Sequence, residues 1–269
     1  RSITHNQRTL LKASQEIRNS RFWKKRSHKH GDKATYNMPD VTLQNMEIRV
    51  LEQLLDQVGT KLSILDIGCG NGYSTITLAS KMRNNYVGVD NCAEAIKVAE
   101  NNRQQRNVSN LSYLACNAME LPFKDNSFDI VLLKRFLSNL ELQDQLTTLT
   151  EARRVLKLDG KLVLFDYFTD GYSKLDGIRS VLNLHPLDKP NHSYLLSKGQ
   201  ISQFNMQGLE LEKELNFSST YFFVTRVIYP FFSNEPKYDT LLHKAASVLP
   251  SVGRFDVDKC FIFRRVEHE

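Results

Sequence analysis

Residues 63–75, SILDIGCGNGYST, combine an acidic side chain with three glycines at the end of a short apolar run. Asp66 lies within the apolar run, and Gly68, Gly70 and Gly72 follow at alternate positions. Glycines between a strand and a helix allow positive φ angles and a close approach to the backbone. A carboxylate there would repel a pyrophosphate but attract an ammonium group. The stretch therefore predicts a site for a ligand with the ammonium group of an amino acid.

Two other nucleotide-binding turns fit this stretch less well. The dinucleotide pattern G-x-G-x-x-G needs its third glycine where Tyr73 stands, because Gly72 comes one position early. A phosphate-binding Walker loop needs G-K-[ST], which does not follow here. We therefore disfavour phosphate-centred ligands at this turn.

The elements around the turn alternate between apolar strands and amphipathic helices. Such alternation predicts an α/β fold with a parallel sheet covered on both faces. Its ligands would lie beyond the carboxyl ends of the strands. We expect a helix between an Asp40 N-cap and Gly59, and another that begins with a capping box of Asn91 and Glu94. The expected strands are 62–67, 85–90, 111–116, 128–133, 161–168, 209–217 and 260–266, and the other expected helices are 73–81, 142–155, 219–231 and 237–248.

Five segments in register resemble the class I methyltransferases that use S-adenosyl-L-methionine. They are LDIGCGNG, VGVD, CNAMELPFKDNSFDIV, LLKRFLSNL and EARRVLKLDGKLVLFD, which together cover roughly residues 60–170. The resemblance implies a Rossmann-like, doubly wound, seven-stranded sheet, mostly parallel with an antiparallel last strand, plus helical lid elements. It also implies S-adenosyl-L-methionine as the cofactor and methyl transfer as the reaction.

The resemblance also implies which residues hold the cofactor. The glycine turn would hold its methionine end and ribose, and Asp90 would bind the two ribose hydroxyls. Asn117 stands where the family has an acid that accepts from the adenine amino group, and its amide oxygen can still accept that bond. Alternative roles are an N-cap for Asp90 and turn stabilisation for Asp66. The predicted cofactor-binding residues are Asp66, Gly68, Cys69, Gly70, Asp90, Asn91, Asn117, Ala118, Met119 and Lys134.

The methyl acceptor must be held by parts outside this core. We predict a basic arm over residues 1–35 and a methyltransferase domain over 36–269. Within that domain, the loop 169–196 and the helical insertion 219–256 would form the acceptor side. The segment around Tyr221 to Arg226 would be a lid over the site, or would pack on the sheet. No metal is expected.

Three residues are candidates for catalysis. His192 lies in a polar loop and is the candidate base, with Tyr194 beside it. Arg135 follows the fourth strand, where it would pair with an acidic acceptor or form a structural ion pair. Water or backbone contacts are the alternative roles of His192 and Tyr194.

Several acceptor classes remain after elimination. The fourth strand ends in LKRF, without the proline pair of amino-methylating nucleobase enzymes, and no Pro-Cys pair suggests attack on cytosine carbon. These absences favour a small acceptor, methylated on oxygen. A faint similarity to bacterial methyltransferases of undefined substrate suggests a sugar; it rests on W-x-x-R-x-x-x-H-G at 23–31, R-F-L-S-N-L at 135–140 and R-x-x-x-x-L-x-P … N-H-x-Y at 179–194. The alternatives are an RNA methyltransferase, a non-catalytic partner subunit with the same fold, and lipid quinone or protein acceptors.

The charge distribution and the cysteines of the chain indicate which binding partners and which cellular compartment to expect. Residues 1–33 hold ten basic and two acidic residues, a balance of +8, while the rest of the chain is at −2. This arm, which includes Trp23, would be the surface for RNA in the alternative above, but a solvated leader is favoured. No apolar run approaches the roughly 18 residues of a membrane span. The four cysteines show no C-x-x-C spacing, and with no signal stretch we expect a cytoplasmic location.

Overall fold

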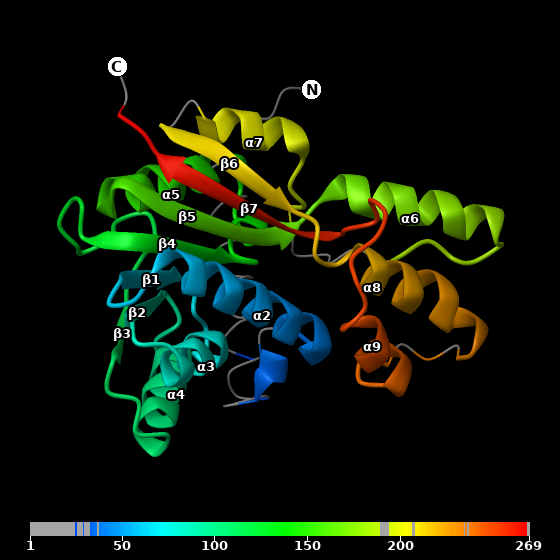
Figure 1. Cartoon of the computed structure of the whole chain (residues 1–269), viewed down its shortest axis with the longest axis horizontal. Coiled ribbons are helices and arrows are strands. Elements are labelled where there is room, and N and C mark those ends of the chain that lie inside the picture. Colours follow the sequence, from blue (N-terminus) through cyan, green and yellow to red (C-terminus); the bar gives the residue numbers. More distant parts are fainter. Residues whose placement is uncertain are drawn as a thin grey trace.

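A seven-stranded mixed sheet forms the centre of the computed structural model, which describes residues 25, 29, 33–36, 38–188, 194–205, 208–233, 235 and 237–267 (Figure 1). The strand order is β3-β2-β1-β4-β5-β7-β6. The first five strands pair in parallel, and β7 runs antiparallel to both β5 and β6. The expected seven strands with an antiparallel last one are confirmed. The strands are β1 (Ser63–Ile67), β2 (Asn85–Asp90), β3 (Leu111–Ala115), β4 (Phe128–Lys134), β5 (Leu156–Tyr167), β6 (Leu209–Leu215) and β7 (Asp258–Arg265).

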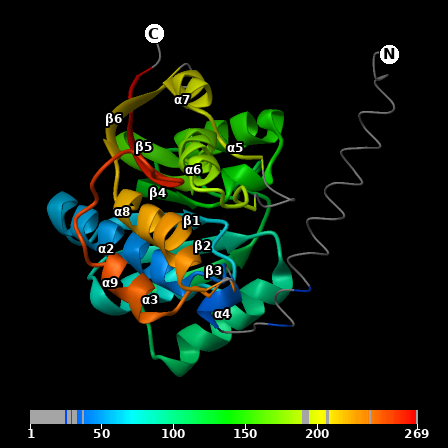
Figure 2. The ribbon, with the colours of Figure 1, turned by 90° about the vertical axis from the view of Figure 1, so that its right-hand side faces the viewer.

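Helices connect the strands and cover both faces of the sheet (Figures 1 and 2). Asp40 caps α2 as predicted, since its side chain accepts from the Leu43 N–H, and Gly59 ends the helix. The predicted capping box of Asn91 and Glu94 is wrong: Cys92 is the N-cap, because Asp90 binds the Cys92 N–H and turns the chain there. The helices are η1 (Ala34–Tyr36), α2 (Val41–Val58), α3 (Tyr73–Lys81), α4 (Ala93–Gln105), η2 (Leu137–Asn139), α5 (Leu142–Val155), α6 (Thr169–Val181), α7 (Lys198–Asn205), α8 (Ser219–Phe223), the π-helix η3 (Val224–Ile228), η4 (Tyr229–Phe231) and α9 (Leu241–Ala246).

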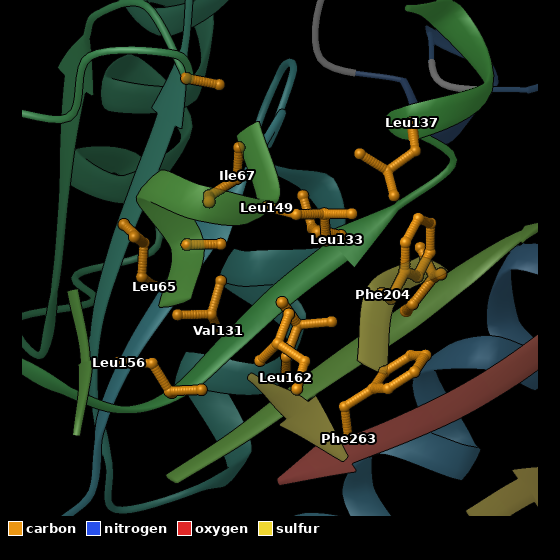
Figure 3. Packing of buried hydrophobic residues seen from close by; sticks show 14 of the residues in the cluster. Leu65, Ile67, Val131, Leu133, Leu137, Leu149, Leu156, Leu162, Phe204 and Phe263 are labelled. Carbon is orange, nitrogen blue, oxygen red and sulfur yellow. The ribbon is translucent and has the colours of Figure 1, made fainter. Parts of the chain in front are cut away.

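Alternating side chains of the central strands build two separate cores. Leu65 and Leu133 face the core under α5 and α7, where Leu149 and Phe204 also lie (Figure 3). Ile64, Ile130 and Leu132 face the opposite core with Leu51 and Leu55 of α2. Because strand side chains alternate with period 2, Asp66 and Lys134 continue the row on the α2 side. The strand pattern thus places an acid and a base on one face, at the carboxyl edge of the sheet.

The region after β5 is more helical than its sequence suggests. Residues 169–196 were expected to be mostly loop, but α6 takes up the first 13 of them. Its Gly171 allows close packing, because a Cβ there would lie 2.0 Å from the Asp256 carbonyl oxygen. A glycine that predicts a loop is therefore a contact point within a helix. The predicted 219–231 helix is instead a succession of α8, η3 and η4, and the second predicted helix shortens to α9.

Helices α6, α8 and α9 stand together beyond the carboxyl end of β5 (Figures 1 and 2). Their shared apolar cluster includes Leu175 of α6, Tyr221 of α8 and Ala246 of α9, together with Leu43 of α2. This layer closes the edge of the sheet at which ligands bind in open parallel folds. Within the described residues, no helix combines the length and the apolar character needed to cross a membrane.

Candidate functional site

A cavity of about 430 Å³ opens at the carboxyl ends of β1, β2 and β4. Its wall combines the glycine turn, the segment after β3, the connection from β4 to α5, and one residue from η1. The lining residues are Tyr36, Asp66, Gly68, Cys69, Gly70, Ser74, Val89, Asp90, Asn91, Cys116, Asn117, Ala118, Met119, Lys134, Arg135, Phe136, Asn139, Leu140, Asp144 and Thr148.

The three glycines of the turn all have positive φ angles, of 77° at Gly68, 57° at Gly70 and 76° at Gly72. The glycines also allow other groups to approach the backbone closely, and two of these groups are side chains of the protein itself. A Cβ on Gly68 would lie 2.2 Å from the ring of Phe136, and one on Gly72 would lie 2.2 Å from the Tyr113 hydroxyl. The glycines therefore make room for aromatic side chains that pack around the turn, as well as for a ligand.

Asp66 and Lys134 place opposite charges in the wall of the same cavity. Asp66 is 3% exposed and its carboxylate accepts from the Thr75 hydroxyl. The Lys134 ammonium donates to Ser74 Oγ at 2.5 Å and lies 3.5 Å from a carboxylate oxygen of Glu47. Burial raises the pKa of Asp66, and the charge of Lys134 opposes that rise. A carboxylate and an ammonium in one cavity wall complement the two ends of an amino-acid zwitterion.

Asp90 binds backbone N–H groups with both carboxylate oxygens. One oxygen accepts from Gly70 N–H at 2.9 Å and the other from Cys92 N–H at 2.9 Å. These bonds connect the glycine turn to the end of β2, and Cys92 takes the N-cap position instead of Asp90. Burial raises the pKa of Asp90, while the two N–H donors lower it. The carboxylate retains further acceptor capacity toward the cavity.

A short segment before α2 covers the glycine turn. The side-chain amide of Asn71 donates to the Lys33 carbonyl at 2.9 Å, and Tyr36 is buried in the cavity wall. The segment after β3 lies elsewhere on this wall, where Asn117 Oδ1 accepts from Met119 N–H at 3.0 Å. The amide oxygen predicted to face a ligand is thus already used once by its own turn.

Arg135 lines the cavity, but its guanidinium forms an ion pair with the fully buried Glu47 of α2. Of the two roles predicted for Arg135, this contact supports the structural ion pair. Two more buried acids lie nearby: burial raises the pKa of Asp166 to about 6, and burial with the neighbouring Glu47 raises that of Asp258 well above its usual range. Beside this cavity there is therefore a buried network of charges.

The structure brings all ten predicted cofactor-binding residues to the wall of this one cavity. Their contact with a cofactor stays a prediction. Tyr194 does not line the cavity, and its hydroxyl donates to Glu141 Oε1 at 3.3 Å. His192 lies outside the described residues. Sequence reasoning missed Tyr36 and the polar residues Asp144 and Thr148 of α5; the only available signal for the last two is a polar position on the buried stripe of that helix.

A second cavity, of about 190 Å³, lies between α2, α6 and α8. Arg226 pairs with Asp40 at 3.0 Å and lies over the rings of Phe222 and Tyr238, 5.6 and 5.2 Å from their centroids. Tyr221 also donates to Asp40 at 2.6 Å, so α8 packs on the start of α2. The lining residues are Met38, Pro39, Asp40, Leu43, Tyr167, Tyr172, Leu187, Asp188, Phe222, Arg226, Tyr238 and Val257.

The sheet order and the carboxylates at the carboxyl ends of β1 and β2 are typical of a Rossmann-like domain for a nucleoside-bearing cofactor. Residues 59–186 match the model of the methyltransferase domain family. Over these residues, the chain carries a methyltransferase domain of the class I S-adenosylmethionine-dependent type. S-adenosyl-L-methionine is the cofactor of that class.

Curated relatives match the same part of the chain. A demethylmenaquinone methyltransferase of Lactiplantibacillus plantarum is 40% identical over 106 residues, which are 38% of this chain and 44% of that protein. The O-methyltransferase rstn1 of Aspergillus nomiae is 32% identical over 126 residues, 44% of this chain and 55% of that protein. The chain thus spans about half the length of the curated relatives it matches.

The fold similarity extends further along the chain. Magnesium protoporphyrin IX methyltransferase of Synechocystis, solved with bound SAH, superimposes with a TM-score of 0.58 at 14% identity. The match covers 87% of this chain and 88% of that one. At this identity the likeness concerns the fold.

Proposed function

We propose that this protein transfers the methyl group of S-adenosyl-L-methionine to an oxygen atom of a small hydroxylated metabolite, such as a sugar. The observation that carries the proposal is the buried pair of Asp66 and Lys134, which shares one cavity with Asp90. A ligand with a zwitterionic end and a vicinal diol complements these three charges.

In this proposal, each charged group binds a different part of the donor. Asp66 accepts hydrogen bonds from its ammonium group, Lys134 pairs with its carboxylate, and Asp90 accepts from the two ribose hydroxyls. These acids lie at the two ends of the donor and not at sulfur. That arrangement suits catalysis, because the sulfonium loses its charge in the transition state and strong anionic binding at sulfur would oppose the reaction.

The second cavity supports a small acceptor. It is lined by residues from both segments that we assign to the acceptor side, 169–196 and 219–256, and by Tyr167 at the end of β5. Its aromatic walls can stack on a ring, and its volume of about 190 Å³ suits a small molecule better than a polymer. His192 remains our proposed base for the acceptor hydroxyl, with Tyr194 as a second candidate.

Methyl transfer itself is an in-line displacement at carbon. The acceptor oxygen forms a bond to the methyl carbon while the bond from carbon to sulfur breaks and its electron pair returns to sulfur. The hydroxyl proton leaves to a base. The protein then holds the acceptor oxygen behind the methyl group and excludes water, which are the principal contributions expected of it.

The test uses the full chain with methyl-labelled S-adenosyl-L-methionine and three sets of acceptors: monosaccharides and glycosides, soluble quinols, and RNA. We expect label on oxygen of a compound in the first set, and loss of labelling in Asp90→Ala but not in the surface control Asp56→Asn. Label that enters only quinol carbon or only RNA would contradict the proposed acceptor. Absence of donor binding would contradict the proposed reaction.

A further inference from the structure

Two polar side chains of α5 line the donor cavity without a role in the predicted site. Asp144 and Thr148 are separated by about one helical turn and therefore lie on the same face of the helix. Asp144 is 7% exposed and Thr148 is fully buried. Polar side chains on the buried stripe of a helix need polar partners.

Hydrogen bonds fix the position of α5 relative to the segment after β3. The Leu121 N–H donates to Glu151 Oε2 at 2.8 Å, and Arg154 donates to the Leu121 carbonyl at 2.9 Å. Ala118 and Leu121 also share a core cluster with Ala152 of α5. Residues 117–119 therefore lie alongside the preceding turns of α5, where Thr148 and Asp144 face the same cavity.

Position 117 offers limited capacity to accept hydrogen bonds. Asn117 has a single acceptor oxygen in its side chain, which already accepts from Met119 N–H, and its other polar atom is a donor. A ring amino group that enters this part of the cavity needs an acceptor. A carboxylate supplies two oxygens with several acceptor positions, so Asp144 retains capacity whatever else it contacts.

Thr148 supplies an independent observation. Its Oγ1 is buried and has no hydrogen-bond partner among the described residues. A buried hydroxyl without a partner is unfavourable, and a ligand that binds it removes that penalty. The hydroxyl belongs to a residue of the cavity wall, so the ligand in the cavity is the available partner.

We propose that Asp144 accepts a hydrogen bond from the 6-amino group of the donor's adenine and that Thr148 donates to an adjacent ring nitrogen. The carboxylate that the segment after β3 lacks at position 117 is thus supplied by α5. This inference rests on the proposed donor site and concerns how that site selects adenine over other purines.

The test compares S-adenosylhomocysteine with S-inosylhomocysteine, in which a carbonyl oxygen replaces the amino group, by calorimetry on the full chain. We expect the wild type to prefer the adenosyl compound at least about tenfold, the range expected for hydrogen bonds to a charged group. Asp144→Ala should remove this preference by weakening adenosyl binding, with inosyl binding unchanged or tighter. Addition of Asn117→Asp to this variant should restore the preference, because it returns a carboxylate to the pocket.

Two further variants separate recognition from folding. Thr148→Val should weaken adenosyl binding about fivefold while the ligand-free protein keeps or gains thermal stability, because an unpartnered hydroxyl is removed. Asp144→Asn keeps the shape of the side chain and should lose part of the preference, and Asp56→Asn, on exposed α2 surface, should lose none. If both Asp144 variants bind the adenosyl compound as the wild type does, this inference is wrong and the proposed function stands. If the wild type binds neither compound, both are wrong.

Discussion

The proposed donor side and the proposed acceptor side of this molecule are built in different ways. The donor cavity takes its charged groups from the ends of adjacent strands, Asp66 on β1, Asp90 on β2 and Lys134 on β4, close to one glycine turn. The second cavity is assembled from segments that are far apart in the sequence, such as Asp40 with Arg226. Strand register alone determines the first arrangement, whereas the second depends on how α2, α6 and α8 pack together.

Glu47 joins the two sides, and its removal should have the largest effect. It is fully buried and pairs with both Lys134 and Arg135. Glu47→Gln would leave two buried cations without their counter-charge, so we expect the free energy of unfolding in urea to fall by about 3–5 kcal/mol. Glu52→Gln on the same helix, which breaks an exposed pair with Lys81, should change it by less than about 1 kcal/mol. Equal effects of the two substitutions would show that the buried network does not hold the two sides together.

Asp166 gives the acceptor side a dependence on pH. It is fully buried and accepts from the Ser138 N–H at 3.0 Å, and burial raises its pKa to about 6. A carboxylic acid with a raised pKa binds its proton more tightly when folded, so its contribution to stability is greatest at low pH and is lost as pH rises through about 6. Relative to Asp166→Asn, the wild type should therefore lose roughly 2 kcal/mol of unfolding free energy between pH 4 and pH 7. Parallel stability curves for the two proteins would contradict this.

Asp90 should control the donor side alone. Asp90→Ala removes the proposed acceptor of the ribose hydroxyls and frees the N–H groups of Gly70 and Cys92. We expect the dissociation constant of S-adenosylhomocysteine to rise about 100-fold, because the ligand would lose its hydrogen bonds to a charged group. Calorimetry measures it directly, with Asp56→Asn as the control. A change below threefold would mean that the ribose does not lie at Asp90.

The smallest effect is expected from the aromatic wall of the second cavity. Tyr172→Leu should leave the affinity for S-adenosylhomocysteine unchanged within about twofold, because Tyr172 lines the second cavity and not the first. The substitution should change only the KM for the acceptor, which can be measured once the acceptor is known. A large loss of donor affinity would show that the two cavities act as one site.

How well each part of the molecule could be predicted depends on how far apart in the sequence its interacting residues lie. Apolar strands and the glycine turn are local signals, which is why the sheet and the wall around Asp66 and Asp90 were predicted. The start of the predicted loop 169–196 is instead α6, in which the small size of Gly171 serves a contact with Asp256, 85 positions along the chain. Asp144 and Thr148 acquire their place in the cavity only when α5 packs beside residues 117–121, a contact that no local pattern announces.

The same difference explains the outcome for the catalytic candidates. Arg135 was placed correctly at the edge of the sheet, but its partner Glu47 lies on a helix 88 positions earlier. The sequence shows Arg135 but not which acid it pairs with. A role in substrate binding therefore cannot be distinguished from a structural ion pair by sequence alone. Tyr194 is similar, since its hydroxyl reaches Glu141 of the segment before α5.

A crystal structure of the full chain with S-adenosylhomocysteine tests the central claim most directly. The account predicts the ribose hydroxyls within hydrogen-bond distance of Asp90, and the amino group and carboxylate of the ligand beside Asp66 and Lys134, respectively. A ligand bound away from these three side chains, or crystals that never take up the ligand at saturating concentration, would contradict it.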